Sequence, residues 1–277
     1  MTKTKAGKAA GRIVVGIGGW TFEPWRDNFY PAGWPQKREL EYASGKLSSI
    51  EINATYYGSQ KRESFAKWRA ETPEGFVFAV KGNRFATNRR ALAESAGSIE
   101  RFFASGVAEL KEKLGPINWQ FMATKAFDAA DFEDFLKLLP KSVEGVAIRH
   151  ALEVRHESFR SPDFIALLRA YGVGLGVADS EEFPEIADIT APFVYVRLMS
   201  ASEGEPLGYA KTALDVWAKR ARIWSEGGAP GDVTYAGATP AAKAPRDVFI
   251  YAINGFKPKA PAAAMALIER LGGKAQA

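Results

Sequence analysis

Nine polar side chains stand at or near the ends of short apolar segments in this chain, where one site could collect them. Carboxylates can transfer protons, amines and guanidinium groups can hold negative charge, and amides can orient hydroxyl groups. This combination predicts acid/base chemistry on a small polar ligand, either anionic or sugar-like. The side chains concerned are Glu51, Asn53, Lys81, Gln120, Glu153, Arg155, Asp179, Arg197 and Asn254.

Both histidines of the chain lie in the segment "RHALEVRH", residues 149–156. Because side chains alternate along a strand, Glu153 and Arg155 share one face, while His150 shares the other with apolar neighbours. We expect His150 to pack against helices. His156 follows the strand, and we expect it to lie beside the site and contribute to ligand binding.

Eight short segments rich in β-branched and aromatic residues alternate with helical patterns. Several are apolar at nearly every position, as strands covered on both faces are. Eight such repeats predict an α/β fold, a single (β/α)8 TIM barrel over residues 13–277. The predicted strands are residues 12–18, 49–53, 76–81, 119–122, 151–155, 174–179, 193–198 and 248–254.

The segments between these strands carry helical periodicity. Residues 98–115 predict one helix that stops at Gly115, and residues 180–192 are too short for much helix. Further helices are predicted at residues 161–172, 212–224 and 261–273. A doubly wound sheet is the competing fold. It lacks support because Thr21 stands where the third glycine of a dinucleotide-binding loop belongs.

In such barrels the active site lies at the carboxyl ends of the strands, so the nine side chains should line one cavity there. Glu153, Asp179 and Lys81 are the candidate catalytic residues, with the first two as proton carriers. Lys81 is a candidate anchor for an anion or a desolvated amine nucleophile. The structural alternatives are a buried Glu153–Arg155 ion pair and a salt bridge from Lys81 to Glu51 or Glu153.

Aromatic residues add a second group of candidates. Trp20 and Tyr57, with Trp25 and Tyr56 nearby, could form a stacking wall for a ligand, although such aromatics more often cap a barrel core. We expect no cofactor. Mg²⁺ or Mn²⁺ on the carboxylates is the lesser alternative, because the histidines of a zinc site are absent.

Positive charge is concentrated at the two ends of a chain whose formal net charge is +5. Residues 1–12 carry four cations and no acid, which predicts a disordered basic tail. Nucleic-acid-binding proteins usually concentrate charge on the folded face, so a small-molecule partner is favoured over nucleic acid. A Gly/Ala/Pro-rich loop at about residues 226–246 predicts a disordered connection.

Several classes of protein are disfavoured by composition. The chain has no cysteine, which excludes disulfides, thiolate metal sites and a cysteine nucleophile. Its start has no apolar stretch that would resemble a secretory signal, and no run of about 18 apolar residues predicts a membrane span. We therefore expect a cytoplasmic protein with no membrane partner. The sequence carries no signal for an oligomeric state.

Several motifs resemble the YecE-like family, also called domain-of-unknown-function family 72. They are "GIGGWTFEPWRDNFYP", "SIEINATYYGSQKRESFAKW", "FVFAVKGNRF", "ALEVRHESF" and "YVRL", in family order between about residues 13 and 256. The resemblance implies a TIM barrel whose activity is not established. The polar positions shared within the family fall on Trp20, Trp25, Glu51, Asn53, Tyr57, Lys81, Gln120, Glu153, Arg155, Asp179, Arg197 and Asn254.

The chain departs from the family pattern at two histidine positions, where Asn88 and Met199 stand. Chemistry that requires those histidines is therefore not shared by this member. The leading interpretation is an enzyme that acts on a small polar ligand at the carboxyl face. The alternatives are a nucleic-acid binding or end-processing protein, and a ligand sensor without turnover.

Overall fold

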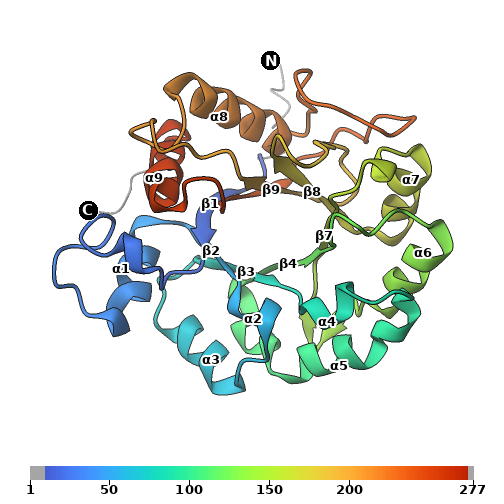
Figure 1. Cartoon of the computed structure of the whole chain (residues 1–277), viewed down its shortest axis with the longest axis horizontal. Helices are drawn as coiled ribbons and strands as arrows, with labels where there is room; N and C mark the ends of the chain where they lie inside the picture. The colour runs from blue at the N-terminus through green and yellow to red at the C-terminus, as the bar shows by residue number, and fades with distance from the viewer. Residues whose placement is uncertain (1–9, 274–277) are drawn as a thin grey trace, which may run out of the picture.

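The computed structural model describes residues 10–273, and its core is a closed barrel of parallel strands. The barrel strands neighbour one another in the order β1-β10-β9-β8-β7-β4-β3-β2, and every pairing between them is parallel. Figure 1 shows these strands at the centre of the molecule with the helices around them. The predicted (β/α)8 TIM barrel is confirmed.

The barrel strands agree with the predicted segments to within two residues at most ends. The exception is β4, which begins five residues earlier than predicted because Gly115 and Pro116 lie within the strand. A two-stranded antiparallel hairpin of β5 and β6 was not predicted. The strands are β1 Ile13–Gly18, β2 Ser49–Ile52, β3 Val77–Lys81, β4 Leu114–Gln120, β5 Ser142–Val143, β6 Val146–Ala147, β7 His150–Glu153, β8 Gly174–Asp179, β9 Phe193–Leu198 and β10 Asp247–Ala252.

Helices occupy all but one of the connections between the barrel strands, and the described residues between β8 and β9 contain none, as predicted. The helix predicted over residues 98–115 is wrong in its second half. Gly106 adopts a φ of +99°, so α5 ends and a 3-10 helix, Val107–Lys113, leads into β4. The helices are α1 Glu39–Lys46, α2 Ala54–Tyr57, α3 Arg62–Ala70, α4 Arg84–Thr87, α5 Ala96–Ala104, α6 Ala129–Leu138, α7 Pro162–Tyr171, α8 Lys211–Ser225 and α9 Ala260–Arg270.

The amino half of the barrel lumen is filled by apolar side chains. Phe193 and Phe249 meet edge to face with ring centroids 5.9 Å apart, and both are buried. Gly174 on the neighbouring strand leaves the room for this packing, because a Cβ there would lie 2.7 Å from the Phe193 ring. Because large and small residues alternate around the barrel, the aromatic rings can fill the amino half of its lumen.

The connection over residues 226–246 has neither helix nor strand, yet hydrogen bonds hold it in place. The Asp188 carboxylate accepts from the backbone N–H groups of Ala236 and Gly237, at 2.6 and 3.1 Å. Arg169 donates to the carbonyl of Thr239 at 2.8 Å. In the structure the segment is an irregular connection with hydrogen bonds to α7 and to the β8–β9 connection, and its predicted disorder stays a prediction.

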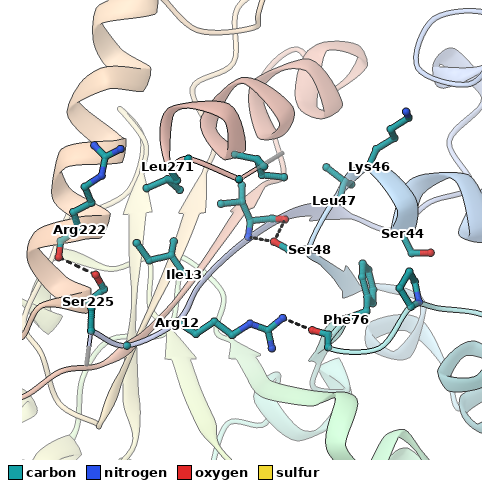
Figure 2. A pocket seen from close by; sticks show the side chains of 18 of the residues that line it. Arg12, Ile13, Ser44, Lys46, Leu47, Ser48, Phe76, Arg222, Ser225 and Leu271 are labelled. Carbon is teal, nitrogen blue, oxygen red and sulfur yellow. Dashed lines mark hydrogen bonds between the residues drawn. The ribbon is translucent and has the colours of Figure 1, made fainter. Parts of the chain in front are cut away.

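A cavity of about 620 Å³ lies at the amino ends of the strands. Figure 2 shows Ile13, Leu47 and Leu271 among its lining residues. Gly11 closes one side, donating its N–H to the carbonyl of Ser225 at 2.8 Å. Of the predicted basic tail, residues 1–9 lie outside the described residues. In TIM barrels this amino face supports stability, so the cavity is distinct from the predicted site.

Candidate functional site

Arg197 joins two buried carboxylates in the carboxyl half of the lumen. Its Nη2 donates to Oε1 of Glu51 at 2.9 Å, and its Nη1 donates to Oε2 of Glu153. These side chains come from β9, β2 and β7, and all three are at least 98% buried. Because side chains alternate along each strand, the inward phase of three separate strands delivers them to one point.

Arg155 extends this cluster toward the mouth of the barrel. Its Nε and Nη2 donate to Oε1 of Glu153 at 2.8 and 2.7 Å, and Nη2 also donates to Gln120 at 3.0 Å. The Arg155 side chain is 20% exposed, and its guanidinium lies 4.3 Å above the ring of Phe183. The Glu153–Arg155 ion pair considered from the sequence is therefore present, and it opens toward solvent.

Two members of the cluster were missed by sequence reasoning. Asn118 donates to Glu153 at 3.3 Å and to Glu51 at 3.5 Å, and the hydroxyl of Tyr195 donates to Glu51. Asn118 stands two residues before Gln120 on the same strand face, and Tyr195 stands two before Arg197. Extending the alternation backward along each strand would have found both.

The charges of the cluster hold Glu153 ionised. Burial alone would raise the pKa of its carboxyl, but the cations of Arg197, Arg155 and Lys81 outweigh burial and lower the pKa to about 2. A carboxylate with so low a pKa is a weak base near neutral pH. The geometry therefore favours Glu153 as the group that fixes Arg155 and Arg197 rather than as a proton carrier.

Lys81 ends β3 on the same inward face, and its surroundings differ from those of the arginines. The residue is 8% exposed, and its Nζ lies 4.3 Å from the ring centroid of Tyr56. Within residues 10–273, this ammonium has no hydrogen-bond acceptor and no carboxylate within 4 Å, so the salt bridge considered from the sequence is absent. Burial and the charge of Arg197 lower the pKa of Lys81 to about 8, against the smaller opposing effect of Glu51.

Asp179 and Asn254 do not join the cluster. Asp179 pairs in register with Leu198, on the helix-facing side, and its carboxylate accepts from the hydroxyl of Tyr209 at 2.6 Å. Burial raises the pKa of Asp179, which hydrogen bonds from Tyr209 and Ser200 oppose. Asn254 is exposed and follows the end of β10. Neither residue lies where the predicted cavity would place it.

The predicted binding aromatics are split between the core and the rim. Trp20 packs edge to face on Trp68 of α3, with ring centroids 5.1 Å apart, and Trp25 is fully buried. These two tryptophans support the helix layer. Tyr57 is 66% exposed at the rim, next to Tyr56.

The two histidines have different surroundings: His150 packs on the helix side as predicted, while ligand binding by His156 stays a prediction. His150 is buried on the helix side, where its Nδ1 accepts from Trp119 at 3.1 Å and its Nε2 bonds the carbonyl of Pro140 at 2.8 Å. Burial lowers the pKa of His150 to about 4, so it stays neutral. His156 instead caps a short 3-10 helix, Glu157–Phe159, by accepting from the N–H of Ser158.

Asn53 lies between the cluster and the rim. Its Nδ2 donates weakly to the carbonyl of Glu51 at 3.5 Å, and a Cβ at Gly18 would lie 2.7 Å from that nitrogen. Its buried Oδ1 has no hydrogen-bond partner among the described residues. Asn53 therefore keeps an acceptor oxygen beside the carboxyl end of β1.

Comparison with known proteins gives the family of this barrel. The sequence matches the family described as "Protein of unknown function DUF72" over residues 14–277. The chain belongs to the DUF72 family. The resemblance found in the sequence motifs is thereby confirmed, and it leaves the activity open.

Relatives of this DUF72 chain are bacterial. The UPF0759 protein YunF of Bacillus subtilis (strain 168) is 28% identical over 191 residues, which cover 66% of this chain and 64% of that protein. A DUF72 family protein from Thermotoga maritima superposes with a TM-score of 0.71 at 20% identity, covering 94% of this chain and 99% of that one. One from Enterococcus faecalis V583 gives 0.69 at 16%, covering 95% and 99%. These structures support the fold alone.

The two carboxylates in the lumen of this DUF72 barrel are already bonded to protein donors. The four oxygens of Glu51 and Glu153 already accept from Arg197, Arg155, Tyr195 or Asn118. A guanidinium between them would also repel a cation. No group of three or more histidine and acidic side chains among residues 10–273 is arranged to hold a metal.

The structure also bears on membrane association and on the family histidines. No helix among the described residues is both long and apolar enough to cross a bilayer. Where the family resemblance led us to expect histidines, Asn88 is exposed after α4 and Met199 is buried after β9. No base of the histidine type is therefore available at either position.

Proposed function

We propose that this chain is an enzyme that binds a small anionic or sugar-like ligand at the carboxyl end of its barrel and acts on it by acid/base chemistry. The observation that carries the proposal is the Lys81 ammonium. It is nearly buried, faces inward at a strand end, and has neither an acceptor nor a paired carboxylate within the part of the chain that the structure describes. Tyr56 is the only group in contact with this ammonium among the described residues, and an anionic ligand would supply the negative partner that it lacks.

The neighbouring groups suit the same ligand. Arg155 uses Nε and Nη2 within the cluster, while its Nη1 takes no part in the hydrogen bonds of the described residues. Arg155 would hold negative charge, and Glu153 fixes the guanidinium in place. Gln120 and Asn53 offer amide groups that could orient hydroxyls. No metal or other cofactor enters this proposal.

Lys81 is the best candidate for proton transfer. A pKa of about 8 allows both protonation states near neutral pH, which is the range in which general acid/base groups work. Glu153 and Asp179 are poorer candidates, because the former is held ionised and the latter lies on the helix side. A ligand sensor without turnover would use the same binding groups, and product formation separates the two.

The test is a thermal-shift survey of small anions, sugar phosphates among them, with the wild type, Lys81→Met and Lys113→Met. A ligand at a hundred times its Kd adds about 2.7 kcal/mol to stability. Lys113 is the matched control, a buried lysine bonded to the carbonyls of Arg69 and Thr72 at the other end of the barrel. We expect Lys81→Met alone to abolish the ligand-induced shift. Equal shifts in all three proteins, or none with any compound, would refute the proposal.

A second candidate function, binding of single-stranded nucleic acid, rests on a different feature of the rim. Tyr57 and Phe85 are 66% and 55% exposed, and the guanidinium of Arg84 lies 5.5 Å from each ring. A hollow of about 200 Å³ adjoins Phe85. Exposed rings beside a cation are the groups that stack bases, at about 1–3 kcal/mol per base.

This second function predicts a distinct pattern. A labelled oligonucleotide should bind with an affinity that falls as salt rises, and Phe85→Ser should weaken binding while Lys81→Met should not. Fluorescence anisotropy measures the affinity of the wild type at each salt concentration and the affinity of each variant. If Phe85→Ser leaves the affinity for the oligonucleotide unchanged, the exposed rings do not stack bases and this second function is refuted.

A further inference from the structure

The environment of Lys81 is that of a reactive amine rather than a structural cation. Its backbone is fixed, because its carbonyl accepts from the hydroxyl of Thr55 at 2.6 Å, and its Nζ sits against the face of Tyr56. Lys113 is buried to a similar degree, but three oxygen atoms within 2.6–3.1 Å accept from its ammonium. Lys113 is thus held by protein oxygen atoms, whereas the amine of Lys81 has no such acceptor among the described residues and is free to attack a ligand.

We propose that Lys81 is a covalent nucleophile that forms an imine with the carbonyl group of a small 2-oxo acid. This inference rests on the proposed function, since it names the ligand class of the same site. The carboxylate of such an acid would pair with the open edge of Arg155, which is 20% exposed at the mouth of the barrel. Arg155 lies close enough to Lys81 for its charge to lower the pKa of that amine, so we expect one small ligand to reach both groups.

The step balances without any further reactant. The ammonium of Lys81 first releases one proton. The neutral amine then adds to the carbonyl carbon, so that one C–N bond forms, the π bond of the carbonyl group breaks, and one proton passes from nitrogen to oxygen. The proton released at the start returns to the hydroxyl group, which leaves as water when the C–O bond breaks. The protonated imine that remains carries the same single positive charge as the original ammonium. The fixed negative charges of Glu51 and Glu153 lie close enough to act on that cation. Addition of water reverses the step.

The amine is prepared for this reaction near neutral pH. With a pKa of about 8 instead of 10.5, its neutral fraction at pH 7 is about 300-fold larger than that of an ordinary lysine. Desolvation beside other cations is a known way to activate a lysine for imine formation. Burial and the charge of Arg197 together provide it here.

The experiment is reductive trapping of the full chain with glyoxylate and cyanoborohydride at pH 7, followed by peptide mapping. The chain has no cysteine, so no thiol competes for the aldehyde. We expect the reduced adduct on Lys81 at least 10-fold ahead of any other lysine, with Lys113 in the same digest as the internal control. Lys81→Arg should remove that adduct. An excess of lactate, which has a hydroxyl in place of the aldehyde or ketone group, should slow trapping in the wild type.

Arg155→Gln tests the ligand class. It should slow trapping by glyoxylate at least 10-fold while leaving trapping by neutral glycolaldehyde within about 2-fold. If Arg155→Gln slows trapping by both aldehydes equally, Arg155 does not recognise the carboxylate of the ligand.

The two proposals fail in different ways. An adduct spread evenly over surface lysines, or none at all, overturns the imine. If small anions still give a thermal shift that Lys81→Met abolishes, the proposed binding function survives that failure. If neither the shift nor the adduct depends on Lys81, both proposals fall.

Discussion

The two halves of the barrel lumen are built from different kinds of side chain. Toward the amino ends, Phe193 and Phe249 close the barrel by apolar packing. Toward the carboxyl ends, Arg197 holds Glu51 and Glu153 in a buried cluster. Apolar side chains of similar volume often stabilise a core as well as buried ion pairs do, or better. A charged half is therefore not what stability alone would favour, and it is the half to which the proposed function assigns the ligand.

Breaking the charged half should have the largest effect. Arg197→Met would leave two buried carboxylates without their shared partner, and we expect a loss of about 3–5 kcal/mol in unfolding free energy at pH 7. Chemical denaturation measures it. A change below about 1 kcal/mol would mean that the cluster is not buried as the structure has it.

The pH dependence of that loss sharpens the comparison. The folded pKa of Glu153, about 2, lies below its unfolded value, so its stabilising contribution is present above about pH 4.5 and is lost as pH falls toward 2. Without Arg197 the carboxylate takes up a proton more readily. The difference between wild type and Arg197→Met should therefore shrink as the solution is acidified from pH 7 to pH 3.

The apolar half should respond without any pH dependence. Phe249→Ala leaves a cavity beside Phe193, and we expect a loss of about 3 kcal/mol that is the same at pH 7 and pH 5. Arg149 lies 4.8 Å from the Phe249 ring, but it remains charged across that range. If the loss of unfolding free energy at this position depends on pH, the expected difference between the two halves of the lumen is contradicted.

Removing the unpaired cation should stabilise the protein. The folded pKa of Lys81, about 8, lies below its ordinary value of 10.5, so the unfolded chain binds more protons between these values and stability rises with pH there. Lys81→Met should therefore gain about 2 kcal/mol at pH 7, and the gain should fade above about pH 10. Loss of stability at pH 7 would show that Lys81 has a structural partner.

The smallest expected effect belongs to Arg155. Arg155→Met leaves Glu153 paired with Arg197, so we expect a loss of only about 1.5 kcal/mol, roughly the value of a hydrogen bond to a charged group. Its ligand-induced thermal shift should fall much further than its stability. A loss as large as that of Arg197→Met would place Arg155 in the fold rather than in the site.

Alternation along strands was enough to predict much of the charged half. Glu51, Glu153 and Arg197 occupy positions of their strands whose side chains point inward. Arg155 continues the same alternation two residues after Glu153. Lys81 follows the same rule. What alternation alone does not give is the pairing, since which carboxylate meets which cation depends on the stagger of strands that are far apart in sequence.

The errors in the predicted site have local physical causes. In β8 the residues facing the lumen are Gly174, Gly176 and Ala178, so the larger apolar residues face the helices and Asp179 goes with them. Asn254 stands three residues after Tyr251, an odd number, so alternation places the two side chains on opposite faces. Small inward residues hide the phase of a strand, because size rather than polarity marks its inner face.

The boundary of β4 was predicted too late for a related reason. Pro116 has no N–H, and a proline inside a segment usually argues against a central strand. The register between β3 and β4 shifts at this point, which accommodates it. The predicted strand begins after Asn118, so the sequence does not predict the hydrogen bonds from Asn118 to Glu51 and Glu153.

Both proposals depend on Lys81 being a largely buried amine without an anionic partner and with a pKa near 8. Competitive labelling with trace acetic anhydride, read by peptide mapping across a pH series, measures this directly, with other lysines of the same chain as internal standards. We expect a labelling midpoint near pH 8 for Lys81, and slower labelling when a small anion is bound. A midpoint at or above pH 10.5, unchanged by any anion, would contradict it.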